Sequence, residues 1–546
     1  MLLCGLTYLL GIFLVPLMDI DAAQYASMSR EMLLSGNYLQ VYDLGNDYLD
    51  KPPMLFWLSS NSLRLFGIHD WAYRLPSFLF SLLAVYSTYR LALLFYKKEI
   101  ALLSAVVLAS CQAMFLMNHD VRTDTMLMGW VICSIWQLAE WYEGKQWKHL
   151  VFAGICIAGG MMTKGPLALM IPVFAFAPHF ILKRKWTAFF YWQYLPLLFI
   201  IALLLVPMSI GLYQQFDQQP GKIILGRAID SGLRFFYWTQ SFGRITGENT
   251  LRENGSIFFL LQNMLWSFLP WILFFIPALV SAIKNIVQQK FHLPGKEEGI
   301  TLAGFLVTYL ALGSSKVQLP HYIFVALPFA AIITGNFLHK LLFTGKWQSQ
   351  QKYFFAVHGV LFTLLWIALI VLLAIPFTTI PWYVVVIAAV CFAGYLLLLM
   401  ARNLRFPKLL AICCYTSIGL NIFLNTAFYP ALLQYQAGNI ATAYINKHQL
   451  PKEQVTIYSD VVNARRSIHF YSDYFFKKTT NPATLAPGSY VITDKTGYSE
   501  LMATTSNSAQ LLFTGKGFAV TKLSLKFLNP ATRDGELEAF YILRMP

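Results

Sequence analysis

The run QYLPLLFIIALLLVPMSIGL, residues 193–212, decides the class of fold. It holds no charged residue, and a helix of about 20 apolar residues reaches across the roughly 30 Å hydrocarbon core of a bilayer. The whole chain shares this character, because 57% of its 546 residues are hydrophobic, only 12% are charged, and the mean hydropathy is +0.54. A water-soluble core cannot bury so much apolar surface, so the sequence predicts an α-helical polytopic membrane protein.

About thirteen apolar runs are candidates for membrane-spanning helices. They lie at 2–18, 76–96, 100–117, 125–142, 149–163, 166–182, 193–212, 257–283, 300–313, 322–342, 353–375, 380–400 and 408–430. The first run lacks the basic start and small-residue cleavage site of a signal peptide, so we expect it to stay in place as a helix. Residues 1–436 are therefore predicted to form one transmembrane domain.

Basic residues gather in six loops that alternate with the other loops along the chain. These loops are 97–98, 145–148, 183–185, 284–296, 340–352 and 402–408. Cytoplasmic loops carry an excess of Lys and Arg, so the pattern predicts a cytoplasmic N-terminus and places the remaining loops outside the plasma (inner) membrane. It also explains the net charge of +15 without a nucleic-acid partner, and membrane lipids are the expected surroundings.

The tail beyond residue 436 differs in composition from the rest of the chain. Strand-like runs at 455–458, 490–493, 510–513, 520–525 and 539–543 alternate with helix-like runs at 440–447 and 464–471. The tail is predicted to be a small soluble α/β domain, residues 437–546, on the extracytoplasmic side. Its role is open between a cap that stabilises the transmembrane domain and a part of the acceptor-binding site.

The predicted outer loop 19–75 carries charged residues where the chain leaves the membrane. Asp19 and Asp21 follow the first apolar run, where a carboxylate is either an interfacial anchor or a functional group. An amphipathic helix with Tyr25 on its apolar face is expected next, lying on the membrane interface and ending at Gly36. The loop therefore holds acids close to the outer edge of the membrane.

Other outer segments place more charges at the same level. Asp50 and Lys51 precede two prolines, which stiffen the backbone and hold both side chains in defined directions. Asp124 ends a short turn between two apolar runs, so it is expected at the membrane edge. Each charge taken alone is explained equally well as a solvated interfacial group. The remaining candidates on this side are Lys164, Lys316 and His321.

In combination and order, these motifs resemble a known family. The first outer loop is similar to that of the aminoarabinose transferases and protein O-mannosyltransferases, which belong to the GT-C superfamily of integral-membrane glycosyltransferases. The residues that carry this likeness are Asp21, Tyr25, Arg30-Glu31-Met32, Asp50-Lys51-Pro52-Pro53 and Arg74-Leu75-Pro76-Ser77. Further motifs follow in the expected order, and the resemblance covers about residues 10–330. They are Thr163-Lys164-Gly165, Leu269-Pro270-Trp271 and the run from Ser315 to Tyr322.

The resemblance implies a GT-C fold and an inverting transfer of one sugar from a polyprenyl-phosphate donor. The acceptor would be a lipid, glycan or protein hydroxyl, as in lipid A modification or protein glycosylation. Asp21 is then the general base, Asp124 the second carboxylate, and Lys51 the contact to the donor phosphate. Further phosphate contacts are expected from Arg244 and Lys316. Supporting roles are expected for Asp19, Asp50, Tyr25, Lys164 and His321.

The chain departs from the family's pattern at several positions. Ala22 stands where relatives carry a second acid, Gln24 where they often carry arginine, and Asp50 where they carry glutamate. The loop 213–256 contains no histidine, whereas some relatives place a metal-binding histidine near its end. We therefore expect no metal and no other cofactor, and the sequence does not assign the sugar.

The alternative hypothesis is a transporter or flippase for a lipid-linked substrate. A transporter places ionisable residues near mid-membrane on broken helices, often in two repeated halves. Here the carboxylates cluster on one predicted face of the membrane and the two halves of the chain do not match. This arrangement favours the enzyme.

Overall fold

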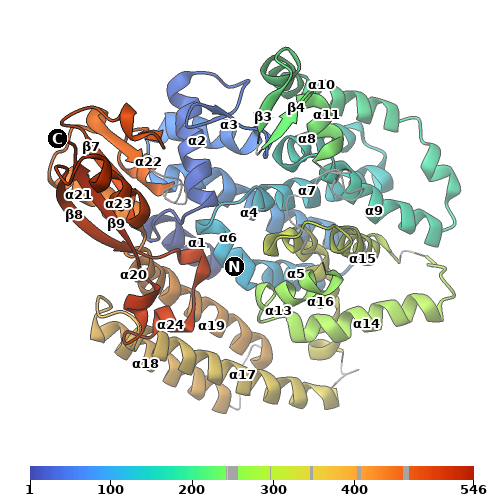
Figure 1. The fold of residues 1–546 in the computed structure, drawn as a ribbon. Coiled ribbons are helices and arrows are strands. Elements are labelled where there is room, and N and C mark those ends of the chain that lie inside the picture. The colour runs from blue at the N-terminus through green and yellow to red at the C-terminus, as the bar shows by residue number, and fades with distance from the viewer. Residues whose placement is uncertain are drawn as a thin grey trace.

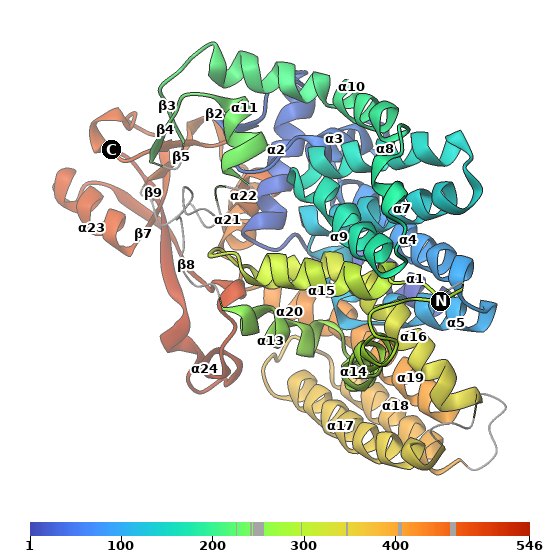
Figure 2. The same ribbon diagram turned by 90° about the vertical axis from the view of Figure 1, so that its right-hand side faces the viewer.

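A computed structural model describes residues 1–224, 226–240, 243, 256–295, 297–344, 348–401, 407–458 and 466–546, without the side chains of residues 227 and 348. Most of these residues are helical, and a mixed β-sheet lies near the C-terminus (Figure 1). Figure 2 shows the sheet on one side of a large helical bundle. The helices of residues 348–423 form the part of the bundle farthest from α2 (Asp21–Ser35).

Most helices of the first half follow the predicted apolar runs; α2 and α3 lie in the predicted outer loop 19–75, and α3 was not predicted. They are α1 (Leu2–Leu14), α2 (Asp21–Ser35), α3 (Met54–Phe66), α4 (Asp70–Phe95), α5 (Lys98–Ala109), α6 (Gln112–His119), α7 (Thr123–Gly144), α8 (Trp147–Lys164), α9 (Leu167–Leu182) and α10 (Tyr194–Leu212). Two short antiparallel hairpins project from this half. Their strands are β1 (Tyr42–Asp43) with β2 (Asn46–Asp47), and β3 (Lys222–Ile224) with β4 (Arg227–Ile229).

The second half continues with helices in the same bundle. They are α11 (Gly232–Arg234), α13 (Ile257–Ser267), α14 (Ile272–Gln288), α15 (Ile300–Gly313), the 3-10 helix η4 (Pro320–Ala326), α16 (Leu327–Phe343), α17 (Gln348–Ala374), α18 (Trp382–Met400), α19 (Lys408–Phe423) and α20 (Tyr429–Leu433). A short helical segment also precedes α10, at Trp186–Phe190 (η1).

Two predicted single helices are each broken into two. The run 100–117 forms α5 and α6, which meet at an angle of 51° around Ser110. The run 257–283 forms α13 and α14, because Pro270 has no N–H to continue the helix. Among the described residues, six helices are long and apolar enough to cross a membrane, or seven if the bent pair is one span. A multi-pass helical fold is thus confirmed, and the count of about thirteen spans stays a prediction.

The C-terminal region contains a five-stranded mixed sheet flanked by helices. Its strands are β5 (Val455–Tyr458), β6 (Lys477–Thr479), β7 (Tyr490–Asp494), β8 (Gln510–Gly517) and β9 (Glu538–Arg544). In space their order is β6-β5-β7-β9-β8, with β5 parallel to both neighbours and β9 antiparallel to both of its own. The helices of this region are α21 (Ala437–Lys447), α22 (Ser467–Tyr471), α23 (Lys495–Thr504) and α24 (Leu525–Leu528).

One predicted strand of this region, 520–525, is wrong. Residues Val520–Lys522 form a 3-10 turn instead, and α24 starts directly afterwards. The Ser524 hydroxyl accepts a hydrogen bond from the Phe527 N–H at 3.1 Å, which is the usual way for a serine to begin a helix. The short edge strand β6 was not predicted. That residues 437–546 form an independent soluble domain stays a prediction.

Helix α2 forms where the sequence predicts it and ends at Gly36, whose φ of 68° is left-handed. It is packed on several sides, because α3 covers one face and α22 covers another. The Asp19 carboxylate, just before α2, accepts hydrogen bonds from the N–H and the hydroxyl of Ser467 at 2.8 and 2.9 Å. These contacts fasten the C-terminal region to the start of the outer loop.

Charged side chains strengthen the same contact. Arg30 of α2 donates to the His469 carbonyl at 2.8 Å and pairs with Asp473 at 3.2 Å. Arg466 pairs with Asp43 of the β1–β2 hairpin at 2.8 Å. The C-terminal region therefore rests directly on the loop that carries Asp21, the predicted general base.

A buried arginine holds the other side of this loop. Arg74 of α4 is fully buried, and its guanidinium donates to the main-chain carbonyls of Ile12, Val15 and Pro16 at 2.6–3.0 Å. It also donates to the carbonyl of His119 at 3.0 Å. The planar group thus satisfies backbone acceptors at the ends of both α1 and α6, which otherwise lack helical partners.

Replacing Arg74 with Met should lower the free energy of unfolding by about 3 kcal/mol, because several buried carbonyls lose a charged donor. Chemical unfolding of the purified protein in detergent measures the change. The control is Arg64→Met on the exposed face of α3, which should leave stability nearly unchanged. Equal stability of the two variants would contradict this role for Arg74.

Candidate active site

Asp50 and Lys51 lie at the centre of the site. The loop that carries them runs from the β1–β2 hairpin to Pro53, the residue that caps α3. The Lys51 amine pairs with the Asp50 carboxylate, which also accepts a hydrogen bond from the Gln240 amide at 3.1 Å. The same amide donates to the Asp50 carbonyl at 2.7 Å. These contacts hold the loop in place, as we expect for a segment that two prolines stiffen.

Lys51 stays protonated in this setting. Its side chain is only 15% exposed, and burial alone would lower the pKa of the amine. The neighbouring Tyr25 hydroxyl and Asp50 carboxylate outweigh burial and raise the pKa of Lys51 above its ordinary value. A fixed positive charge thus faces the site, and it suits an anionic ligand.

A second ion pair joins the ends of α7 and α8. Asp124, in the first turn of α7, pairs with Lys164 in the last turn of α8. His321 places Nε2 3.5 Å from the other oxygen of Asp124, and the Lys164 amine lies 4.0 Å from the centre of the Tyr322 ring. The Asp124 side chain is only 2% exposed, so its charge is held almost entirely by these neighbours.

The third charged group joins α2 to the turn before α7. Arg122 pairs with Asp21 and, through Nε, with Asp120 at 3.0 Å. The Asp21 side chain is 38% exposed, far more open than that of Asp124. Asp21 is therefore the more open of the two predicted catalytic carboxylates.

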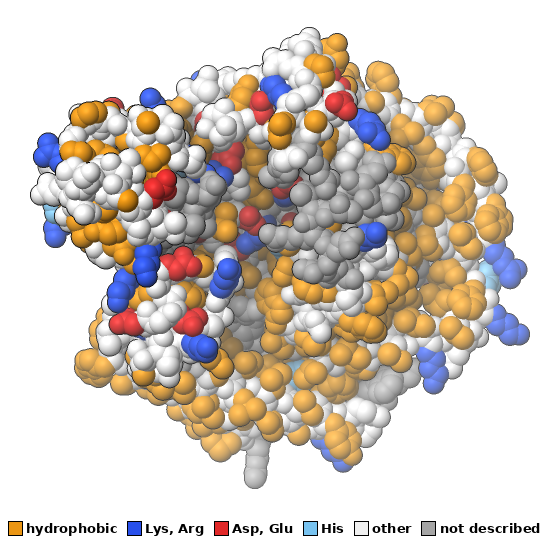
Figure 3. All heavy atoms as spheres, in the orientation of Figure 1, with side chains coloured by type: hydrophobic (Ala, Val, Ile, Leu, Met, Phe, Trp, Pro, Cys, Tyr) orange, Lys and Arg blue, Asp and Glu red, His pale blue; other side chains and the backbone are white. Residues whose placement is uncertain are grey.

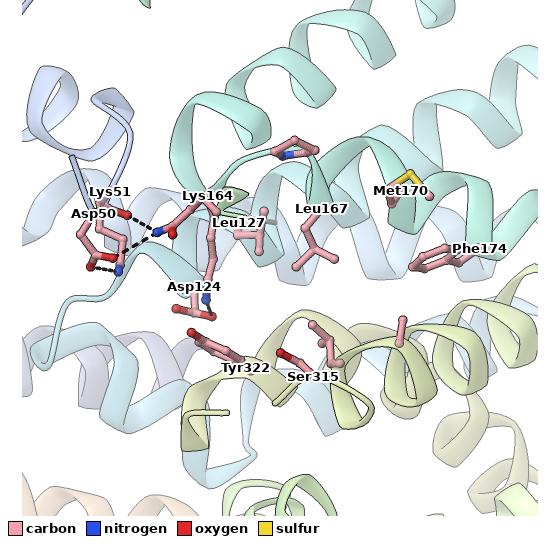
Figure 4. A pocket seen from close by; sticks show the side chains of 14 residues that line it. Asp50, Lys51, Asp124, Leu127, Lys164, Leu167, Met170, Phe174, Ser315 and Tyr322 are labelled. Carbon is pink, nitrogen blue, oxygen red and sulfur yellow. Dashed lines mark hydrogen bonds and ion pairs between the residues drawn. The ribbon is translucent and has the colours of Figure 1, made fainter. Parts of the chain in front are cut away.

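A narrow cavity of about 250 Å³ begins at these charges and continues between apolar helices (Figure 4). Its polar end is formed by Asp50, Lys51, Asp124, Lys164 and Tyr322. Its other end is formed by α9 and α15, with Leu167, Met170, Phe174 and Leu312. Figure 4 shows Lys51 and Lys164 at one end and Phe174 at the other. The cavity matches a ligand with a charged head and an apolar tail.

A second and larger cavity of about 920 Å³ meets the first at Asp50 and Lys51. The outer loop contributes Asp21, Tyr25 and Asp43, and η4 contributes His321. The opposite wall belongs to the C-terminal region and contains Ile457, Arg466, Phe476, Lys477 and Lys478. Figure 3 shows acidic and basic side chains in the hollow between this region and the bundle. The second cavity is therefore polar and wide.

Most predicted site residues come together around these cavities. Asp21, Tyr25 and His321 line the larger one, Asp124 and Lys164 the smaller one, and Asp50 and Lys51 both.

Two predicted site residues lie elsewhere, and a third cannot be placed. Asp19 binds Ser467, as described above. Lys316 is exposed and lines neither cavity. Arg244 lies outside the residues that the structure describes. The chemical role of each predicted residue stays a prediction.

Sequence reasoning missed Arg122, Gln240, Tyr322 and Arg466. Arg122 stands between Asp120 and Asp124 in one charged turn, and this neighbourhood was the available signal. Tyr322 directly follows the predicted residue His321, which was the signal for it, whereas Gln240 and Arg466 are brought to the site only by contacts between distant segments. Over the described ranges, no group of three or more His, Cys, Asp or Glu side chains is placed to hold a metal ion.

Parts of the chain are similar to known proteins. Residues 50–210 match the family model described as dolichyl-phosphate-mannose-protein mannosyltransferase. The undecaprenyl phosphate-alpha-4-amino-4-deoxy-L-arabinose arabinosyl transferase of Erwinia tasmaniensis is 27% identical over 63% of this chain and 59% of its own length. The transferase of the same name from an Enterobacter species is 26% identical over 70% of this chain and 65% of its own length. The match thus spans about three fifths of these relatives.

The fold is also that of a solved structure. The crystal structure of ArnT from Cupriavidus metallidurans bound to undecaprenyl phosphate matches 99% of this chain and 96% of its own chain, with a TM-score of 0.74. At 17% identity this likeness establishes the fold. The comparisons confirm the predicted resemblance to integral-membrane glycosyltransferases that use lipid-phosphate sugar donors. Among those proteins, the chain is similar to the aminoarabinose transferases.

The Asp124–Lys164 pair should show strong energetic coupling, because either charge left alone would be buried and unpaired. A double-mutant cycle with Asp124→Asn and Lys164→Met is expected to give a coupling energy of about 3 kcal/mol in chemical unfolding. The matched control is the exposed pair Lys516–Asp534, 3.7 Å apart, with Asp534→Asn and Lys516→Met, for which about 0.5 kcal/mol or less is expected. Similar coupling for both pairs would show that burial does not strengthen the interaction.

Proposed function

We propose that this protein is an inverting glycosyltransferase that moves a single sugar from a polyprenyl-phosphate donor to a hydroxyl of a lipid, glycan or protein acceptor. The reaction would take place on the outer face of the plasma (inner) membrane, with the N-terminus in the cytoplasm. The observation that carries this proposal is the meeting of two cavities at Lys51, one narrow and largely apolar, the other wide and polar.

The narrow cavity suits the donor. A polyprenyl chain would lie between α9 and α15 against Leu167, Met170 and Phe174, where it replaces lipid contacts with protein contacts. The phosphate would then lie beside Lys51, with Lys164 close by. A fixed cation stabilises the negative charge that develops on the leaving phosphate, and this electrostatic contribution is often the largest in such a reaction.

The wide cavity suits the acceptor, and Asp21 opens into it. As the acceptor oxygen bonds to the anomeric carbon, its proton would pass to the Asp21 carboxylate. The bond from that carbon to the phosphate oxygen breaks with its electron pair on the phosphate, and attack from the opposite face inverts the anomeric centre. Both carboxylates are in ion pairs, Asp21 with Arg122 and Asp124 with Lys164, but Asp124 is far more deeply buried. Asp124 would therefore orient the acceptor, and Asp21 would accept the proton.

The relatives support this donor class. Two of them are named as transferases that use an undecaprenyl phosphate-linked sugar, and the structural neighbour was solved with undecaprenyl phosphate. Ala22 and Gln24, which replace the family's usual acid and arginine, weigh against assigning aminoarabinose as the sugar. No resident metal or cofactor is included in the proposal.

The alternative transporter or flippase is less well supported by the site. The acids and cations gather at one end of α7 and α8 rather than half-way along the bundle. A transporter would move the intact lipid-linked sugar across the bilayer and form no glycosylated acceptor. Product analysis therefore separates the two functions.

Asp21→Asn should reduce transfer by about 10²–10⁴-fold, because the amide cannot accept the acceptor's proton. The measurement is mass spectrometry of lipids and glycans from cells that carry no copy, the wild type or the variant. Asp230→Asn, on an exposed acid of a later outer loop, is the control and should keep full product levels. Full product from the Asp21 variant would remove this residue from the role of base. No product with the wild type would instead argue against the transferase.

Lys51→Met should weaken binding of undecaprenyl phosphate to the purified protein by about 10–100-fold, because a buried charged donor to the phosphate is lost. Native mass spectrometry or a thermal-shift titration measures the affinity. Lys447→Met removes an exposed cation from α21 and should have no effect. If Lys51→Met binds the lipid as tightly as wild type, the phosphate contact lies elsewhere.

A further inference from the structure

A third cavity lies between α7, α8, α9 and α10, and it extends toward the end of these helices that is far from the site. It has a volume of about 230 Å³ and an almost wholly apolar lining from α7, α8, α9 and α10, including Tyr142, Phe176, Phe180 and Leu197. Trp141, also in its wall, lies 17 residues along α7 from Asp124. At 1.5 Å per residue, this places the Trp141 end of the cavity about 25 Å from the site along the helix axis, whereas its other end, at Ile157 and Leu169, lies nearer to the site. That distance is close to the thickness of the hydrocarbon core.

Two lysines stand at the rim of this cavity. The Lys145 amine lies over the rings of Trp141, Tyr142 and Tyr191, 4.3–4.7 Å from their centres. The Lys185 amine lies 5.6 Å from the centre of the Tyr142 ring. In the part of the chain that the structure describes, neither amine forms an ion pair with a carboxylate. The aromatic faces hold the amines in place, and the nearby carboxylate of Glu143 interacts with Lys145 without forming an ion pair.

The segment beside these lysines has the composition of a membrane interface. Residues 183–192 read KRKWTAFFYW, with three consecutive cations followed by aromatic side chains. Trp186, Phe190 and Trp192 are 59%, 86% and 62% exposed. Exposed aromatic rings next to Lys and Arg are typical of a protein surface at the level of lipid headgroups. Figure 3 shows basic side chains along the right-hand edge of the hydrophobic surface.

We propose that this cavity and its two lysines form a binding site for one anionic phospholipid. An acyl chain occupies the apolar cavity between α7, α9 and α10, and the headgroup phosphate lies between the amines of Lys145 and Lys185. The charges are complementary, since the site offers cations that form no ion pair with a carboxylate among the described residues. The basic loops place this end at the cytoplasmic leaflet, which is rich in anionic lipids.

The proposed lipid site is separate from the proposed enzymatic function. The third cavity shares no lining residue with the two cavities at Lys51. A lipid in this position would fill the gap between α9 and α10, the helices that frame one side of the bundle. Its binding is measurable without any knowledge of donor, acceptor or activity.

The test is native mass spectrometry of the purified full chain with phosphatidylglycerol or phosphatidylcholine. Wild type is expected to bind phosphatidylglycerol at least fivefold more tightly than phosphatidylcholine. The double variant Lys145→Gln/Lys185→Gln should lose about tenfold in phosphatidylglycerol affinity and show no headgroup preference. Lys97→Gln/Lys98→Gln, which removes two exposed cations from another basic loop, is the matched control and should behave as wild type.

A third variant tests the chain pocket without changing any charge. Ala177→Phe fills the cavity and should weaken binding of both lipids, while its melting temperature reports whether the fold is retained. Equal wild-type affinity for the two lipids, or equal loss in the double variant and its control, would overturn the proposal. So would full displacement of the lipid by glycerophosphoglycerol, which has the headgroup but no acyl chain.

Discussion

The guanidinium of Arg74 ties the end of α1 to the end of α6, and the position of the predicted catalytic acids depends on this link. Asp21 follows α1 within a few residues, and Asp124 follows α6 in the same way. Neither chain segment is long enough to move far from its anchored carbonyls. A single buried cation thus sets the spacing of two carboxylates that come from segments about 100 residues apart in the sequence.

Around that anchor, most charges of the site are arranged in pairs. Lys51 faces Asp50, Lys164 faces Asp124, and Arg122 faces Asp21 and Asp120. Pairing lowers the free-energy cost of keeping ionised groups at the edge of an apolar bundle, where an isolated charge is strongly destabilising. A phosphate that arrives beside Lys51 meets an amine that is already charged and already oriented. The wall that the two cavities share is therefore prepared to bind an anion.

The helical part of the fold could be predicted from the sequence because an apolar segment long enough to cross a bilayer must satisfy its backbone hydrogen bonds internally, and a helix does so. The break at Pro270 follows from local chemistry, whereas the bend near Ser110 depends on packing between helices. The strand predicted at 520–525 is wrong because Ser524 begins a helix there. The prediction gave more weight to the apolar side chains in this segment than to the single serine that caps the helix. Asp21, Asp50, Lys51, Asp124 and Lys164 were predicted and do line the cavities.

The rest of the site depends on contacts between residues that are far apart in the sequence, and no local sequence pattern predicts such contacts. Asp19 was predicted to support the site, yet its carboxylate binds Ser467, 448 positions away in the sequence. Arg466 reaches the larger cavity from the C-terminal region by pairing with Asp43. That region was predicted either to cap the bundle or to help bind the acceptor. It packs on the outer loop and also forms one wall of the larger cavity, so the geometry is compatible with both roles.

The central claim is that the narrow cavity holds a lipid phosphate. A cryo-electron microscopy structure of the protein with undecaprenyl phosphate tests it most directly. We expect the phosphate within hydrogen-bonding distance of the Lys51 amine and the prenyl chain between α9 and α15, against Met170 and Phe174. An ordered lipid phosphate at any other place, with this cavity unfilled, would contradict the account.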